Sequence, residues 1–289
     1  MICAQPEKIS PTTRSRPALA RERAQCARAM LADCRLCAHD CGVNRLAGET
    51  GRCHAGAEAR FFSAQVEVSD ELELMPTFSV ALSGCDLRCD FCITGAASWD
   101  AHAGSGFDAV AMAARAEAAL HRGARTIMVL GGEPTIHLPA ALELVALLPP
   151  SARLIWKTNA HGSAPARALL DGMFDVWLAD FKFGNNACAQ RLAKVPDYVR
   201  GVRENLRWAN EHSELIVRHL LMPGHVECCW RPVAEWLAEN LPGVKVNLRA
   251  GFWPAWHARR HGELSHVISR TETESATTIA KRCCLSLID

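Results

Sequence analysis

SGCDLRCDFCIT, residues 83–94, places three cysteines, Cys85, Cys89 and Cys92, in one short loop. A closed site for a single metal ion or an iron–sulfur cube normally takes four ligands from the protein. Three thiolates leave one coordination position open. The composition of the chain and the segments around the loop must indicate what fills that position.

The composition describes a folded protein without a strongly charged surface. The chain has 289 residues, of which 49% are hydrophobic, enough to form a core, and a disordered protein is therefore excluded. Lys and Arg number 32 against 31 Asp and Glu, a formal net charge of +1. We therefore expect no nucleic-acid partner and no binding to anionic membranes.

The cysteine count must be interpreted together with the cellular compartment. The first 25 residues contain no apolar core of the kind found in signal peptides, and no apolar run of roughly 18 residues occurs in the chain. We therefore expect a cytoplasmic protein that does not enter a membrane. Fourteen cysteines in a reducing compartment, several of them clustered, favour metal ligation over disulfides.

Changes in sequence texture predict four segments. The first holds a loose arm up to about residue 17 and a short helix; a cysteine-rich metal-binding segment follows, then alternating strands and helices, and last a lid and helix. Their predicted bounds are 1–33, 34–77, 78–250 and 251–289.

The segment 78–250 predicts an α/β fold. Short apolar, β-rich runs alternate with amphipathic stretches, the pattern of βα units around a parallel sheet. Six such units fit an incomplete, curved (β/α)6 barrel better than a closed eight-fold barrel. The predicted strands are 78–84, 126–132, 153–159, 175–181, 214–221 and 244–249, and the predicted helices are 18–31, 107–122, 139–148, 164–172, 197–211 and 228–240.

Polar and glycine-rich residues follow the ends of these strands. In barrels of this kind the chemistry lies in the loops at the carboxyl ends of the strands, so one ligand could contact all of them. The three-cysteine loop follows the first strand. The later strands contribute Gly131, Gly132, Glu133, Lys157, Asn159, Asp180, Lys182 and Arg218.

The C-x3-C-x-aromatic-C loop, with Phe91 before Cys92, together with GGEP at 131–134, resembles the radical S-adenosylmethionine (SAM) superfamily over residues 78 to about 250. The resemblance implies a [4Fe–4S] cluster on Cys85, Cys89 and Cys92, with the amino and carboxylate groups of SAM completing the open iron. It further implies reductive cleavage of SAM to a 5′-deoxyadenosyl radical, which takes hydrogen from a small-molecule or peptide substrate. A reductant such as flavodoxin or ferredoxin would supply the electron.

The resemblance also suggests roles for the residues after the strands. Gly131 and Gly132 would let the backbone approach SAM, and Glu133 or nearby carbonyls would accept from its ammonium group. The alternative for these three is a tight turn capped by Pro134. The other positions serve either as cofactor contacts or as structural ion-pair partners: Lys157, Asn159, Asp180, Lys182 and Arg218.

A second cysteine cluster precedes the barrel. CRLCAHDCGVNRLAGETGRC carries Cys34, Cys37, Cys41 and Cys53 in a C-x2-C-x3-C-x11-C arrangement, which predicts a closed metal site. Both zinc and a second [4Fe–4S] cluster accept four thiolates, and the compact spacing favours iron–sulfur. His39 and His54 are interpreted as exposed loop histidines rather than zinc ligands.

The remaining seven cysteines receive no functional role. Cys228–Cys229 and Cys283–Cys284 are adjacent pairs on predicted helices, where neighbouring side chains point about 100° apart, so we interpret them as packing residues. The other three stand alone in the sequence: Cys3, Cys26 and Cys188.

Within the superfamily, the order of motifs is similar to that of uncharacterised proteins related to the pyruvate formate-lyase activating enzymes. Residues 157–160 read Lys-Thr-Asn-Ala, where activating enzymes often carry Asp-Thr-Asn-Gly, which reverses the local charge. Two alternatives to hydrogen abstraction from a small molecule or peptide therefore stay open. One is installation of a glycyl radical on a partner protein, and the other is a non-catalytic iron–sulfur or zinc protein that carries electrons or serves as an adaptor.

Overall fold

The computed structural model describes residues 14–288. Cys3 and most of the predicted N-terminal arm lie outside the described residues. The first helix, α1 (Arg16–Ala29), begins two residues before its predicted start, with Pro17 in its first turn.

All six predicted parallel strands are present and neighbours in the chain are neighbours in the sheet. They are β2 (Thr77–Leu82), β4 (Thr126–Gly131), β5 (Leu154–Thr158), β6 (Val176–Asp180), β7 (Glu214–Leu220) and β8 (Lys245–Arg249). Their near-continuous apolar composition suits a sheet covered on both faces. Within the described residues every position of β2 is buried.

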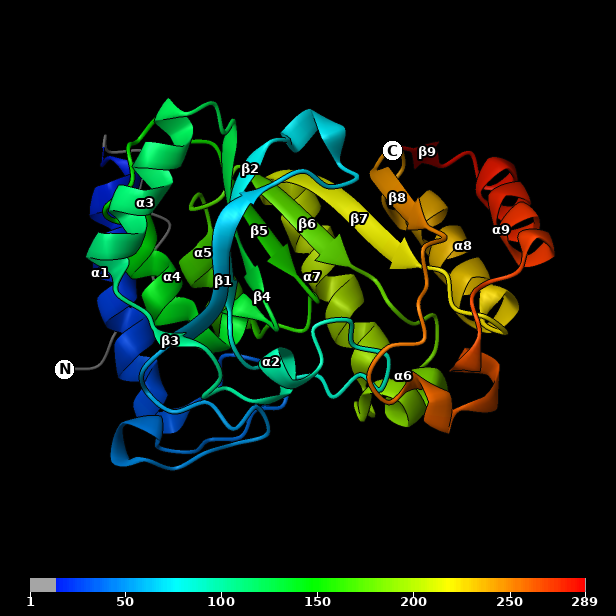
Figure 1. Ribbon diagram of the computed structural model, residues 1–289, viewed down its shortest axis with the longest axis horizontal. Coiled ribbons are helices and arrows are strands. Elements are labelled where there is room, and N and C mark those ends of the chain that lie inside the picture. Colours follow the sequence, from blue (N-terminus) through cyan, green and yellow to red (C-terminus); the bar gives the residue numbers. More distant parts are fainter. Residues whose placement is uncertain (1–13, 289) are drawn as a thin grey trace.

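Three further strands extend the sheet at its two edges. β1 (Arg60–Glu67) pairs antiparallel with β2, β3 (Ser105–Gly106) pairs antiparallel with β1, and β9 (Ser286–Leu287) pairs parallel with β8. Within residues 14–288 the strand order is β3-β1-β2-β4-β5-β6-β7-β8-β9, so the sheet is open (Figure 1). The expected α/β fold with an incomplete barrel is confirmed.

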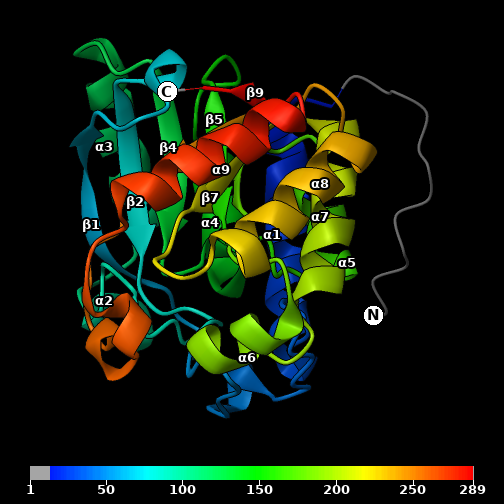
Figure 2. The ribbon, with the colours of Figure 1, turned by 90° about the vertical axis from the view of Figure 1, so that its right-hand side faces the viewer.

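The helices mostly cover one face of the curved sheet, as Figure 2 shows for α1, α5, α7 and α8. The predicted helix at 228–240 is a π-helical turn, Val226–Trp230, followed by α8 (Arg231–Asn240). No helix of residues 14–288 is long and apolar enough to span a membrane. The other α-helices of residues 14–288 are α2 (Ala96–Trp99), α3 (Ala109–His121), α4 (Leu138–Val145), α5 (Ala164–Leu170), α6 (Asn186–Ala193), α7 (Tyr198–His212) and α9 (Arg270–Arg282).

The inner face of the sheet is closed at the amino ends of the strands. Leu74 and Met75 precede β2 and pack with Met128, Ile155 and Ile216 inside the curved sheet. The carbonyl of Leu74 accepts a hydrogen bond of 2.8 Å from Thr126, the first residue of β4. This apolar plug leaves the opposite end, where the strands finish, for polar chemistry.

Candidate cofactor site at the carboxyl ends of the strands

The three-cysteine loop leaves the end of β2 and folds back on itself. Gly84 has a φ of +82°, which suits glycine, and directs the chain away from the strand. Cys85 and Cys89 are each 8% exposed, and Cys92 is partly exposed. The backbone N–H of Leu87 lies 3.4 Å from the Cys85 sulfur, a contact that orients the thiol.

The environment of Cys85 and Cys89 favours binding of a metal cation. Burial raises the pKa of Cys85 well above its usual range and that of Cys89 to about 12. Such thiols stay neutral at pH 7 unless a bound cation deprotonates them. Three free thiols on one short loop, two of them buried, therefore fit a cluster that takes three protein ligands.

A buried carboxylate stands next to the first cysteine. Asp86 accepts hydrogen bonds of 2.7 Å from the Asn159 side chain and 2.8 Å from Nδ1 of His161. Burial is the largest single influence and raises the Asp86 pKa, but the hydrogen bonds from His161 and Asn159 and the charges of His161 and His39 together lower it below its usual value. The loop is thus fixed to the residues after β5. The Asp86 and His161 positions were missed by the sequence analysis, although Asp86 directly follows a predicted ligand.

The GGEP residues fix the end of β4 against the loop. A Cβ on Gly131 would lie 2.0 Å from the Leu82 carbonyl oxygen, and one on Gly132 would lie 1.9 Å from the Gly84 carbonyl oxygen. Glu133 is 1% exposed and accepts bonds from the Thr158 hydroxyl at 2.8 Å and the Asn159 N–H at 2.7 Å. Burial and the Asp86 charge raise the Glu133 pKa to about 7.

The structure brings together the charged residues predicted at the ends of β5, β6 and β7. Lys182 contacts Asp180 at 2.5 Å, and Arg218 lies 4.0 Å from the same carboxylate. Burial raises the Asp180 pKa, but the charges of Lys182 and Arg218 act against burial, and the Asp180 pKa is lowered overall. Burial and the charge of Arg218 lower the Lys157 pKa to about 8.

Glu71 belongs to the same cluster and was not predicted. It is fully buried and lies 3.0 Å from Nε of Arg218. Three cations, Lys157, Lys182 and Arg218, thus face two carboxylates, Asp180 and Glu71, a surplus of one positive charge. The positive charge of Lys182 also lowers the Cys89 pKa, against the effect of burial. The charged cluster therefore borders the cysteine loop.

The cysteine-rich leader packs directly on this site. Backbone bonds of 2.9 Å from Ala38 to His161 and 3.0 Å from Ser163 to Leu36 join the leader to the residues after β5. His39 is half-buried and its Nε2 lies 3.0 Å from the Asp86 carbonyl oxygen. The expectation that His39 is an exposed loop histidine is therefore wrong, whereas His54 is exposed as expected.

The four leader thiols lie near one another but do not converge on a single ion. Burial raises the Cys37 pKa, and the charges of Asp86, Cys53 and Cys41 raise it further. Burial also raises the Cys53 pKa, and the charge of Cys34 contributes to that increase. Yet within residues 14–288 the groups whose ligand atoms all lie within 4.8 Å of one another do not include this quartet. The buried guanidinium of Arg45 lies 3.6 Å from the Cys34 sulfur and donates to the Ile136 carbonyl at 2.7 Å.

Three of the seven cysteines that received no functional role lie close together. The sulfur of Cys188, which is isolated in the sequence, lies 3.9 Å from the sulfur of Cys228. Cys228 and Cys229 also both face His225, at 3.3 Å and 3.6 Å, so these two residues do more than pack.

The residues after β8 cover one side of the cysteine loop. The N–H of His257 donates to the Asp90 carbonyl at 2.7 Å, and Nε2 of His261 lies 2.7 Å from the Asp90 carboxylate. The Trp256 ring packs against Gly95, where a Cβ would lie 2.8 Å from it, and is 41% exposed. This segment touches the loop itself.

Known protein families include one that matches this combination of fold and cysteine loop. The family model described as the radical SAM superfamily matches residues 80–237, more than half of the chain. This chain belongs to the radical SAM superfamily. The matched region begins in β2 and includes the cysteine loop, the GGEP residues and the charged residues at the ends of β5, β6 and β7, but not Glu71.

The chain is also similar to one curated protein and to solved structures of another protein. An uncharacterized protein of Methanocaldococcus jannaschii, MJ0674, is 28% identical over 284 residues, covering 94% of this chain and 81% of that protein. Streptococcus suis SuiB bound to its precursor peptide SuiA has a TM-score of 0.54 at 16% identity over 70% of this chain. SuiB bound to S-adenosylmethionine has a TM-score of 0.53 at 17% identity over 71% of this chain. The match spans less than half of SuiB, 46% and 47% of its chain, and this likeness concerns the fold.

Proposed function

We propose that this protein is a radical SAM enzyme that takes a hydrogen atom from a small-molecule or peptide substrate. The observation that carries the proposal is the placement of Cys85, Cys89 and Cys92 at the carboxyl end of β2, beside the charged cluster from β5, β6 and β7. A chain that only stored or carried electrons would need a closed set of four protein ligands at this loop.

The residues divide into those that hold the cluster and those that surround SAM. Cys85, Cys89 and Cys92 would bind a [4Fe–4S] cluster whose fourth iron takes the amino and carboxylate groups of SAM. When bound and reduced by a donor such as flavodoxin or ferredoxin, the pair supplies a 5′-deoxyadenosyl radical. Asp86 and Asn159 keep the loop in place, and the apolar plug at Leu74 excludes water from below.

The charged cluster supports an anionic or zwitterionic ligand group at the barrel mouth. Lys157 is partly buried. Within residues 14–288 its ammonium group forms no ion pair and no hydrogen bond. A carboxylate would supply the partner that this cation lacks. The carboxylate of SAM and that of an amino acid or peptide substrate both have the required chemistry.

We also propose that Cys34, Cys37, Cys41 and Cys53 bind a second [4Fe–4S] cluster. Thiolates around one zinc ion lie about 3.8 Å apart, whereas each thiolate of a cube binds a different iron and the sulfurs lie farther apart. The absence of a compact group at these four thiols supports the cube. The contact of His39 with the Asp86 carbonyl supports this proposal, because the two proposed clusters would then lie on neighbouring segments.

Replacing one cluster ligand tests the proposal. In anaerobically reconstituted, reduced Cys89→Ala protein, the formation of 5′-deoxyadenosine from SAM should fall by more than about 100-fold, because even the partners of metal ligands change activity by 10–100-fold. The matched control is Cys26→Ala, a cysteine on α1 far along the chain from the loop, which should retain the wild-type rate. Wild-type cleavage by the Cys89 variant would contradict the assignment.

A further inference from the structure

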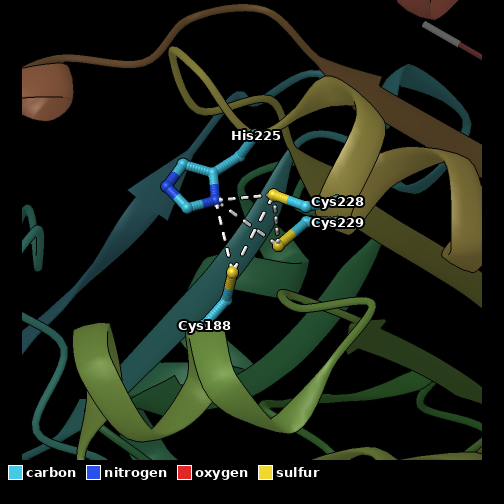
Figure 3. Close-up of side chains that lie close together, drawn as sticks. All are labelled: Cys188, His225, Cys228 and Cys229. Carbon is cyan, nitrogen blue, oxygen red and sulfur yellow. Dashed lines mark hydrogen bonds between the residues drawn. The ribbon is translucent and has the colours of Figure 1, made fainter.

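Four potential metal ligands that the proposed function does not use converge on one point. They are Cys188 on α6, His225 in the loop after β7, and Cys228 and Cys229 in the π-helical turn, and Figure 3 shows all four side chains directed toward one another. Their ligand atoms all lie within 4.8 Å of one another. We propose that Cys188, His225, Cys228 and Cys229 form a structural zinc site.

The distances match a tetrahedron around one ion. With zinc–sulfur bonds of about 2.3 Å and zinc–nitrogen bonds of about 2.0–2.1 Å, tetrahedral edges are about 3.8 Å between sulfurs and about 3.6 Å between sulfur and nitrogen. The Cys228 sulfur lies 3.9 Å from that of Cys188 and 4.0 Å from that of Cys229. Nδ1 of His225 lies 3.6, 3.3 and 3.6 Å from the sulfurs of Cys188, Cys228 and Cys229.

The spacing of these thiols is that of neither a disulfide nor an iron–sulfur cube. A disulfide requires a sulfur–sulfur distance of about 2.03–2.05 Å, about half of those found here. A [4Fe–4S] cube requires a wider set, because each of its ligands binds a different iron. Three thiolates and one imidazole in tetrahedral array are the donor set of structural zinc, and four protein ligands leave no open position for a substrate.

Local structure explains why residues adjacent in sequence act together. His225, Cys228 and Cys229 stand at positions i, i+3 and i+4, which lie on one face of a helical turn. Asn185 caps α6 by accepting from the Cys188 N–H at 2.8 Å, and its side-chain amide donates to the Cys228 carbonyl at 2.7 Å. One side chain thus fixes the approach of α6 to the π-helical turn.

Partners around the ligands complete the site. The Gly184 N–H hydrogen-bonds the Cys229 sulfur, and a Cβ at Gly184 would lie 2.3 Å from the Cys229 carbonyl oxygen. Nε2 of His225 lies 3.6 Å from Oε1 of Glu263, which also forms an ion pair with Arg191 of α6. Nη2 of Arg191 lies closer to the same nitrogen, at 3.2 Å. The Arg191–Glu263 ion pair therefore packs against the far side of the His225 ring and limits its orientation.

The site links three segments at the carboxyl ends of the strands. It joins α6, which follows β6, to the turn that follows β7, and through Glu263 it reaches the segment after β8. The end of α6 in turn holds the cysteine loop, since Ala193 and Leu192 accept backbone bonds of 3.0 Å and 2.9 Å from Arg88 and Asp90. Zinc would therefore hold the support on which the cysteine loop rests.

The test measures metal content and does not depend on activity. In anaerobically purified full-length protein, Cys228→Ser and His225→Gln should each lower zinc by one equivalent per chain and leave iron unchanged. The matched control, Cys284→Ser, replaces another exposed cysteine and should retain the zinc. Unchanged zinc in both variants, or loss of iron in place of zinc, would overturn the proposal.

A second measurement uses the wild-type chain and so does not require a variant to fold. After chelation, the protein is treated with iodoacetamide with and without added Zn²⁺, and labelled cysteines are mapped by mass spectrometry. Zinc should protect Cys188, Cys228 and Cys229 together and leave Cys284 reactive. Equal labelling with and without zinc, or a Cys188–Cys228 disulfide in the untreated protein, would refute the site. Failure of SAM cleavage would leave both results unaffected.

Discussion

Single residues around the cysteine loop act by close backbone contact. Gly132 has no unusual φ, yet a Cβ there would lie 1.9 Å from the Gly84 carbonyl oxygen, and backbone has little freedom to move away. The end of β4 and the start of the loop therefore approach each other only because residue 132 has no side chain.

Replacing Gly132 with Ala should lower the free energy of unfolding by about 3 kcal/mol, the upper end of the usual cost of overpacking. The matched control is Gly251→Ala, since a Cβ at Gly251 meets nothing within 4 Å and its φ is ordinary. Urea unfolding of both variants measures the difference. Equal stability of the two variants would show that the contact carries no strain.

His137 introduces a pH dependence. It is 2% exposed, and its Nε2 lies 2.9 Å from the carbonyl oxygen of Ser83, at the start of the loop. Burial, together with the charge of Arg45, lowers the His137 pKa from 6.5 to about 3. The unfolded chain therefore takes up a proton near pH 6.5 that the folded chain refuses, so this contribution to stability is present above pH 6.5 and is lost as the pH falls toward 3.

Between pH 7.5 and 5.0, His137 should therefore account for a loss of about 2 kcal/mol in unfolding free energy. The measurement is urea unfolding of wild-type protein and His137→Gln at both pH values. The variant should lose about that much less than the wild type on acidification. A variant with the wild-type pH dependence would show that this histidine titrates normally in the folded chain.

At the scale of elements, the sequence predicted the parts with a strong pattern. The six predicted strands, β2 and β4 to β8, combine apolar runs with polar ends, so their positions could be derived. β1 was missed because its residues are mostly half-buried and do not form an apolar run, and α6, with 8 residues, is too short to show a clear period. The convergence of Cys188 with His225 could not be predicted, because it depends on the approach of α6 to the turn after β7. His225-x-x-Cys228-Cys229 was the signal available in the sequence.

The cysteine-rich leader should determine half of the iron content of the protein. Two cubes would give about eight irons per chain, and Cys37→Ala should lower this to about four, because only the leader cluster loses a ligand. Iron analysis of anaerobically reconstituted protein measures the change. SAM cleavage should remain measurable in this variant, since the three loop cysteines are intact. About four irons in the wild-type protein would instead assign the leader to zinc.

The whole molecule brings the segments for which we propose metal binding to one end of the sheet. In Figures 1 and 2 the leader, α2 and α6 lie together at the end where the parallel strands finish. The apolar plug at Leu74 and Met75 occupies the other end of the inner face. This division separates stability from chemistry, as in other barrels built from βα units.

The central claim is that the cluster on Cys85, Cys89 and Cys92 has one iron without a protein ligand. Electron paramagnetic resonance of the reduced, oxygen-free protein, recorded before and after addition of SAM, tests it directly, and Cys37→Ala leaves the loop cluster as the one source of signal. We predict that SAM changes the g-values of that signal, because its amino and carboxylate groups bind the open iron. An identical spectrum with and without SAM would contradict this account.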